Sequence, residues 1–333
     1  AVTTTDTLAL RDDPEVPRTA LGRGAREQRA TATVRRLPWG AAIPIAAVSG
    51  LLLDAAFPSI GWWPLAFLSI AGGLWTLIGR SIGGAFLVGL AYGAAFYFTH
   101  LMWVVQFLGP IPWIALAGVE SLLFALGAIP IALAYRWGAL LERRATRRLL
   151  LPVLIATLWA ARELLLGTWP YSGFPWGRIG MSQAGGPFAE AASWVGVTGL
   201  TLLIVWLCAC VVDWATRPAP RKLAGLLPAA VILALLLVPA FPTTEAGSLR
   251  VGWVQGDGPA GYFDTRSPGD VLAAQRQASD ALLGEPMDLL VWPEGGVDSD
   301  PLNTPATART LDELVAGAEA PLLMNAATAR GED

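Results

Sequence analysis

One carboxylate lies where an enzyme often places a general base. The stretch "MDLLVWPEGG", residues 287–296, has an apolar run that ends at Trp292, then Pro293, then Glu294 and two glycines. The run predicts a short buried strand, and a carboxylate that follows such a strand is well placed to accept a proton. Pro293 fixes the backbone before Glu294, and the glycines let a substrate come close. The alternative is an ordinary solvated glutamate, because exposed Glu is common.

The elements around Glu294 must position it, and their pattern alternates between strand and helix. We predict a strand over 249–256 and a helix that opens at Ser267, where Asp270 completes a capping-box pattern, and runs to about residue 283. The strand that ends at Trp292 comes next, followed by a helix over 304–318 and a strand over 321–325. This β-α-β-α-β order is expected of an α/β layer with a largely buried sheet.

The composition of the whole chain excludes an ordinary soluble enzyme. Of the 333 residues 54% are hydrophobic and only 15% are charged, with 15 Trp and 25 Pro. Apolar segments recur at about the 20 residues that a helix needs to cross a bilayer. We predict seven membrane helices, over 39–57, 62–78, 82–107, 111–135, 149–166, 191–212 and 223–241.

Basic residues are distributed unevenly between the two sides of these helices. If the N-terminus is inside, the inner segments carry sixteen Lys and Arg, whereas the outer loops carry only Arg178. The positive-inside rule therefore predicts a cytoplasmic N-terminus and places everything after Phe241 outside the cytoplasm. Residues 1–37 are polar and mixed in charge, so we expect a disordered cytoplasmic tail before a signal anchor, with no cleavable signal peptide.

Two motifs resemble a known family. "VQGD" (254–257) and "DLLVWPEGG" (288–296) look like the opening of a nitrilase-type domain. Upstream, "YSGFPWGRIGMSQAGGP" (171–187) and "WVGVTGLTLLI" (194–204) resemble the outer loop and next membrane helix of the apolipoprotein N-acyltransferase family, actinobacterial type. The resemblance covers roughly residues 38–329. It implies an α-helical integral membrane bundle over 38–242, followed by an extracytoplasmic α/β nitrilase-like (αββα) domain over 247–333 that is incomplete at its C-terminus.

The resemblance also implies a reaction, in the cell membrane. In this family a Cys thiolate takes a fatty acyl chain from a membrane phospholipid as a thioester. The α-amine of a diacylglyceryl-cysteine on an apolipoprotein then attacks that thioester. Glu294 would be the general base of a Glu-Lys-Cys triad, in which the Lys stabilises the oxyanion. The resemblance implies no cofactor, no metal and no nucleic acid.

The chain departs from the family at the other two triad positions. Its single lysine, Lys222, falls in a predicted cytoplasmic loop, and its two cysteines, Cys208 and Cys210, fall in the sixth predicted helix. The two cysteine side chains point about 200° apart on a helix, which favours apolar packing over a disulfide or a metal pair. We therefore expect an inactive fragment of a longer enzyme. The alternative is a non-catalytic membrane scaffold, for example an anchor for a polyprenol-phosphate mannosyltransferase.

Aromatic loop residues are further candidates for substrate binding. Phe174, Pro175 and Trp176 lie in the outer loop, either as an interfacial anchor or as a wall of the portal through which lipid reaches the site. Tyr262 and Phe263 follow the first strand of the α/β layer and could line an acyl groove.

Ionisable residues within predicted membrane helices form a second group of candidates. Arg162 and Glu163 occupy the outer part of the fifth helix, where charges are costly and usually face a cavity or a partner, so Glu163 is a candidate for substrate binding. His100 ends the aromatic run "FYFTH" and has no carboxylate close in sequence, which favours a packed histidine over a catalytic one.

Overall fold

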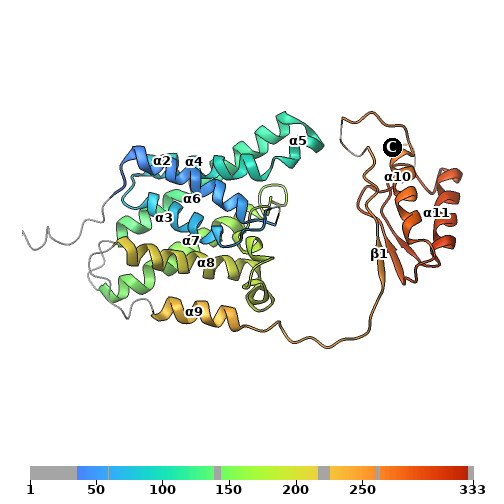
Figure 1. Cartoon of the computed structure of the whole chain (residues 1–333). Coiled ribbons are helices and arrows are strands. Elements are labelled where there is room, and N and C mark those ends of the chain that lie inside the picture. The colour runs from blue at the N-terminus through green and yellow to red at the C-terminus, as the bar shows by residue number, and fades with distance from the viewer. Residues whose placement is uncertain are drawn as a thin grey trace, which may run out of the picture.

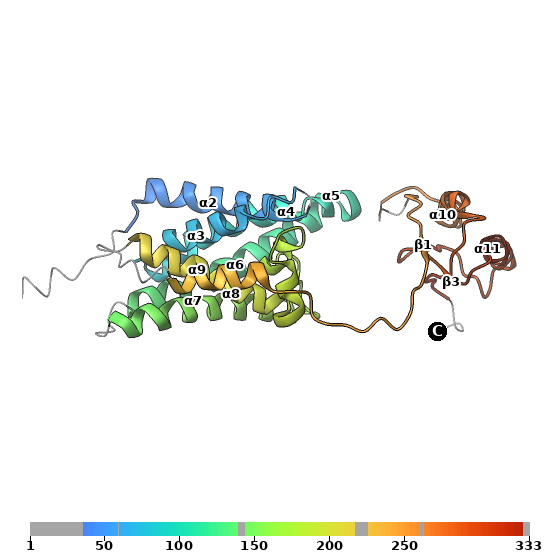
Figure 2. The same cartoon turned by 60° about the horizontal axis from the view of Figure 1, so that its bottom comes forward.

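The computed structural model describes residues 36–58, 60–138, 144–216, 226–259, 261 and 263–328, with the side chains of 144–147 left out. The predicted tail over 1–37 lies almost wholly outside these ranges, as do Lys222 and Tyr262. In the described part, a bundle of helices is joined by an extended segment, 238–250, to a small sheet with two helices (Figure 1). The sheet lies beyond the end of the bundle that is opposite the start of α2 (Trp39–Ala56), as both views show (Figures 1 and 2).

The bundle contains the apolar helices that the sequence predicts. Among the described residues, five helical segments are long and apolar enough to cross a membrane, and two more apolar helices are shorter, at 13 and 12 residues. The protein is therefore a membrane protein. The helices are α2 (Trp39–Ala56), α3 (Leu65–Leu77), α4 (Ile82–His100), α5 (Trp103–Leu108), α6 (Pro110–Gly138), α7 (Arg144–Leu166), α8 (Ala192–Thr216) and α9 (Leu226–Leu237).

The prediction of one continuous helix over 82–107 is wrong. Helix α4 ends at His100, and α5 begins at Trp103. The Trp113 indole N–H donates to the Phe98 carbonyl at 3.2 Å, and the Thr99 hydroxyl donates to two further carbonyls of the preceding turn. Side-chain hydrogen bonds to helix carbonyls of this kind are found where helices bend or end. The predicted end of the last membrane helix at 241 is also too late, because α9 stops at Leu237, two residues before Pro239.

Close helix contacts in the bundle depend on small residues. A Cβ on Gly93 of α4 would lie 3.2 Å from the Ser121 backbone of α6, and one on Gly50 of α2 would collide with the Tyr92 carbonyl of α4. A hydrogen bond of 2.5 Å between the Tyr92 hydroxyl and Ser69 also connects α4 to α3. Small residues and interhelical hydrogen bonds of this kind hold membrane helices together.

The C-terminal region contains a three-stranded parallel sheet in the order β1-β2-β3, with β1 (Val251–Trp253), β2 (Leu289–Val291) and β3 (Leu322–Leu323). Leu290 pairs with Gly252 on one side and with Leu322 on the other. Helices α10 (Asp270–Ser279) and α11 (Pro305–Ala318) connect the strands and share one apolar core with Leu290 and Trp292. The predicted β-α-β-α-β order is therefore present, although each strand is shorter than predicted.

The expectation of a largely buried sheet is wrong for the described residues. Both helices pack on one face, because each crossover moves one strand further in the same direction. The opposite face exposes Val251 and Leu323, and Trp253 keeps 75% of its surface. The sheet thus has one covered and one open face.

Candidate functional site

Glu294 lies at the carboxyl edge of the parallel sheet. It follows β2 by three residues, at the edge where Gly256 follows β1 and Asn325 follows β3. In sheets of this kind ligands bind outside the carboxyl ends of the strands. The Glu294 side chain is exposed, and it makes no hydrogen bond or ion pair with any other residue that the structure describes. Its carboxylate is therefore open to a ligand.

The turn that carries Glu294 is fixed through its backbone. Gly295 has φ +73°, a conformation that favours glycine, and its N–H donates to the Asn325 side-chain oxygen at 2.6 Å. The Gly296 N–H donates to the Pro293 carbonyl at 3.1 Å, and Val297 forms a parallel bridge with Ala326. The turn is thus attached to the end of β3 at two points.

A second attachment joins this turn to the start of α10. The Asp298 carboxylate accepts hydrogen bonds from the N–H groups of Gly269, Val271 and Leu272, at 3.0 to 3.2 Å. The first amides of a helix have no partners within the helix, and a carboxylate there is also stabilised by the helix dipole. The predicted cap at Ser267 is therefore wrong in its main point. The Ser267 backbone takes part, because its N–H donates to the Asp270 carboxylate at 2.7 Å and its carbonyl accepts from the Asp270 N–H at 3.1 Å.

The strand before Glu294 is anchored by Trp292. Its indole N–H donates to the Ser279 hydroxyl at 2.9 Å, and this hydroxyl donates to the Gln275 carbonyl. The buried Gln275 side chain in turn accepts from the Gly256 N–H at 3.0 Å. One hydrogen-bonded chain thus connects the carboxyl ends of β1 and β2 through α10. Glu294 is a free side chain on a rigid support.

At the adjoining end of the bundle, the predicted outer-loop residues meet an aromatic side chain that the sequence did not indicate. Trp176 stacks on Trp103 of α5 with ring centroids 4.8 Å apart, and on Phe174 at 5.9 Å. Pro175 lies exposed between Phe174 and Trp176. Trp103 was missed because it lies about 70 residues away, inside a segment that reads as one continuous helix.

The Glu163 side chain of α7 connects this loop to α8 through hydrogen bonds. The side chain is only 7% exposed, and its two oxygens accept from the Trp159 indole, the Thr201 hydroxyl and the Ile179 backbone N–H, at 2.9, 3.1 and 3.4 Å. The Arg162 guanidinium lies 3.6 Å away and also faces the rings of Phe124 and Trp159. The Arg162–Glu163 charge pair is thus buried, and both Glu163 oxygens accept hydrogen bonds. It offers no open carboxylate to a substrate.

A contact of Phe263 connects the sheet region to the end of α5, the helix that carries Trp103. The Phe263 ring lies against Gly109, the residue after α5, 3.4 Å from the position of a Cβ there. Phe263 is therefore close to the helix that carries Trp103. Tyr262, its predicted companion, lies outside the described residues.

The remaining ionisable candidates lie away from Glu294. His100 has a carboxylate partner that its sequence neighbourhood lacks, because its Nδ1 lies 3.0 Å from Asp54 of α2, between the rings of Phe57 and Phe96. Cys208 is buried in α8, and its thiol faces the Phe67 carbonyl at 3.5 Å. Among the residues that the structure describes, no group of His, Cys, Asp and Glu could hold a metal ion.

Comparison with known proteins decides the family. The model of the apolipoprotein N-acyltransferase N-terminal domain matches residues 49–210. An apolipoprotein N-acyltransferase of Geobacter metallireducens is 32% identical over 280 residues, which is 78% of this chain and 53% of the relative. One of Mycolicibacterium smegmatis is 30% identical over 315 residues, or 83% of this chain and 50% of the relative. The chain belongs to the apolipoprotein N-acyltransferase family.

Both alignments extend beyond the bundle. The matched family model ends at residue 210, within α8, whereas alignments that cover 78% and 83% of the chain must reach into the sheet region. The chain spans about half the length of the curated relatives it matches.

Proposed function

We propose that this chain is part of an enzyme that moves a fatty acyl chain from a membrane phospholipid to the α-amine of a diacylglyceryl-cysteine on an apolipoprotein. In the first half of the reaction a Cys thiolate attacks the phospholipid ester, which gives a thioester and releases the lysophospholipid. In the second half the amine attacks the thioester, which gives the amide and regenerates the thiol. The names of the relatives support the activity.

The observation that carries this proposal is that Glu294 has a free carboxylate on a fixed turn. A general base needs an oxygen that is free to take a proton and a position that does not drift. Glu294 has both, since its carboxylate is unengaged among the described residues while Asn325 and Asp298 hold its turn. We assign it the thiol proton in the first half-reaction and the amine proton in the second. The resemblance gives the other roles to a Cys and a Lys, and Cys208 fits poorly because it is buried in α8.

A nitrilase-like αββα arrangement is the fold that we propose for the complete C-terminal domain. Such a fold stacks two sheets that each carry helices on one side. Here α10 and α11 cover one face of the sheet, and the other face exposes Trp253. An apolar sheet face of this kind supports a second layer against it.

The proposed orientation places Glu294 outside the cytoplasm, on the strength of the sixteen-to-one distribution of basic residues. We predict that a cysteine introduced at Ser299 reacts with a membrane-impermeant thiol reagent on intact spheroplasts, whereas one introduced at Thr146 reacts only after lysis. The reverse pattern would contradict an external active site.

Loop aromatics give the acyl donor a route in this proposal. Phe174, Pro175 and Trp176 with Trp103 form an apolar surface at the end of the bundle nearest the sheet, and Phe263 reaches the same end. We propose that the acyl chain passes along this surface to the sheet edge. Glu163 then serves the site by holding the loop, not by touching substrate.

The experiment uses a chimera in which this chain replaces the matching half of the Mycolicibacterium smegmatis relative. Purified in detergent, it is given a phospholipid with a labelled acyl chain and a diacylglyceryl peptide. We expect labelled peptide from the chimera, and a rate lower by about 10² to 10⁴ for Glu294→Gln, as is typical of losing acid–base catalysis. Glu285→Gln is the matched control, because Glu285 is also exposed in the sheet region. Equal rates for the two variants would refute the role of Glu294.

The alternative of a membrane scaffold for a polyprenol-phosphate mannosyltransferase has no observation in its favour. The relatives named above are acyltransferases, and the described residues that surround Glu294 fit a site better than a passive surface. A chimera that folds but transfers no acyl chain would return the scaffold to consideration.

A further inference from the structure

Helices α2 and α4 begin side by side at the end of the bundle far from the sheet. A Cβ on Gly84 of α4 would lie 3.1 Å from the Trp39 ring of α2, and further along Gly50 of α2 meets Tyr92 of α4. The two helices therefore run parallel, with both N-termini at one end. Helix N-termini carry partial positive charge, so this end favours an anion.

Two arginines lie at this paired end on the Trp39 ring. The Arg80 guanidinium carbon is 4.2 Å from the ring centroid, and that of Arg36 is 5.5 Å away. Neither guanidinium is paired with a carboxylate in the part of the chain that the structure describes. Two cations that lie on one ring without a carboxylate partner repel each other unless an anion joins them.

The Arg80 side chain is fully buried, yet one of its donors is unused. Its Nε donates to the Thr76 carbonyl at 3.1 Å and its Nη2 to the Leu37 carbonyl at 2.7 Å. Its Nη1 has no acceptor among the described residues. A buried donor without an acceptor is costly, and a charged donor more so, so this atom indicates a missing ligand.

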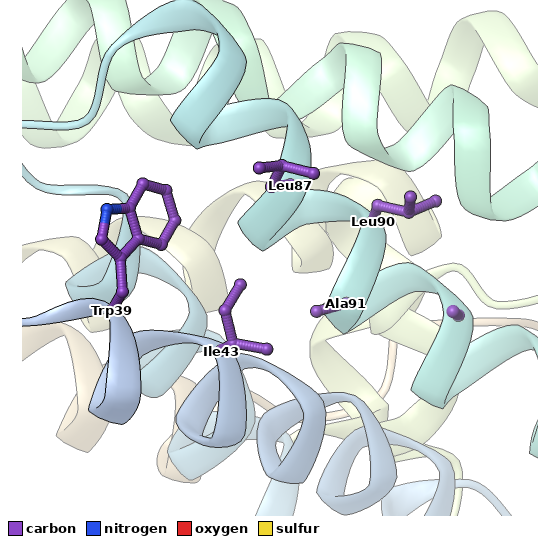
Figure 3. A pocket seen from close by; sticks show the side chains of 6 residues that line it. Trp39, Ile43, Leu87, Leu90 and Ala91 are labelled. Atoms are coloured by element: carbon purple, nitrogen blue, oxygen red, sulfur yellow. The ribbon is translucent and has the colours of Figure 1, made fainter.

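An apolar groove leads away from the arginines between the same two helices. It has a volume of about 390 Å³ and is lined by Trp39, Ile43, Leu87, Leu90, Ala91 and Ala94. Figure 3 shows the side chains of α2 and α4 facing each other across it. From Leu87 to Ala94 it follows α4 for roughly 10 Å, at 1.5 Å per residue. This length and its apolar lining suit part of one acyl chain.

We propose that this groove binds one anionic membrane phospholipid, with its phosphate between Arg36 and Arg80 and an acyl chain along α2 and α4. The Trp39 indole, 43% exposed, and the exposed Arg36 side chain would move aside to admit the phosphate to Arg80. A net-negative headgroup is favoured over a zwitterionic one, because no described carboxylate lies there to receive an ammonium group.

This lipid would not be the acyl donor of the proposed reaction. The site is at the start of α2 and α4, at the end of the bundle opposite the sheet that carries Glu294, as both views show for these elements (Figures 1 and 2). A bound lipid here would instead tie the paired starts of α2 and α4 to one leaflet. The inference therefore stands whether or not the acyl-transfer proposal holds.

The test is native mass spectrometry of the chain in detergent, titrated separately with phosphatidylglycerol, phosphatidylethanolamine and inorganic phosphate. We expect one phosphatidylglycerol to bind at least about tenfold more tightly than phosphatidylethanolamine, because charged hydrogen bonds are worth a tenfold change or more. Arg36→Gln should remove that preference. Ala91→Phe should weaken binding of both lipids by filling the groove and leave the arginines intact.

Controls separate this site from general attraction to basic residues. Arg136→Gln removes one positive charge from an exposed position near the end of α6 and should change nothing. Arg36 is also exposed, so Arg36→Gln keeps the fold and remains informative if Arg80→Gln does not fold. Unchanged phosphatidylglycerol binding in Arg36→Gln would overturn the proposal, as would inorganic phosphate binding as tightly as the lipid. Tight lipid binding that appears only after removal of residues 1–35 would show that the tail, not lipid, is the occupant.

Discussion

Two glutamates, one in the bundle and one at the sheet edge, show opposite uses of the same side chain. Glu163 is buried, and its oxygens accept from Trp159, Thr201 and the Ile179 amide, with Arg162 beside them. Glu294 is exposed and accepts from no described residue, although its turn is fixed at the backbone. A carboxylate with both oxygens engaged in buried hydrogen bonds can hold a structure, whereas one with both oxygens free can take a proton.

This difference divides the work of the protein between its two regions. In the bundle, the Glu163 carboxylate itself accepts the hydrogen bonds, and these hold the loop of Phe174 and Trp176. At the sheet edge, hydrogen bonds end on the backbone around the carboxylate and leave the side chain free. Substitutions should therefore cost stability in the first region and activity in the second.

The largest effect on stability should follow Glu163→Ala. It removes the acceptor of three buried donors and leaves Arg162 without its anion, which costs about 3 to 5 kcal/mol for a broken buried pair. Denaturation of the chain in mixed micelles, followed by tryptophan fluorescence, measures the loss. Glu190→Ala is the control, because Glu190 is exposed near the end of the same connection between α7 and α8 and should be nearly neutral. Similar small losses for both would mean that Glu163 does not hold the loop.

A smaller effect is expected for Asp298→Ala at the sheet edge. The change frees three amides at the start of α10 and should cost about 0.5 to 2 kcal/mol, as for other lost helix caps. Hydrogen exchange of the amides of 269–272 should rise, and Asp312→Ala, at an exposed position of α11, should leave them unchanged. Protection that survives in Asp298→Ala would show that the turn of Glu294 is attached to α10 less firmly than we argue.

The smallest effect should follow Trp176→Ala. Stacked aromatic pairs contribute about 0.5 to 1.5 kcal/mol beyond their buried area, and Trp176 is half exposed. The loop should open more often, so limited proteolysis within 167–178 should be a few times faster, in line with that energy. Trp62→Ala removes another exposed tryptophan and should not change this rate. A faster rate in both variants would argue against a specific stack with Trp103.

Periodicity and composition predicted the helices of the bundle and the order of the strands. The break after His100 was not predictable in the same way. At this break the Phe98 carbonyl accepts from the Trp113 indole, 15 residues away. Hydropathy does not report such a side-chain hydrogen bond. The strand lengths were overestimated because apolar residues continue past the last paired residue, as at Val254 and Trp292.

At the candidate site, the sequence indicated Glu294 but not the residues that fix its turn. Glu294 is flanked by proline and glycine, which can be read directly. Asn325 and Asp298 support the turn from the end of β3 and from the following loop, and neither spacing has a motif. Asp54 was missed as the partner of His100 for the same reason, since it lies 46 residues away on α2. Long-range pairs need the fold before they can be seen.

The most direct test of the account is whether Glu294 is needed to form the acyl-enzyme. The chimera and its Glu294→Gln and Glu285→Gln variants are incubated with labelled phospholipid and no peptide, and label that hydroxylamine releases from the protein is counted. We predict labelling of the chimera and of Glu285→Gln, and none above background for Glu294→Gln with its unfolding midpoint unchanged. Labelling of Glu294→Gln at the rate of the parent would contradict the central claim that this exposed carboxylate takes the thiol proton.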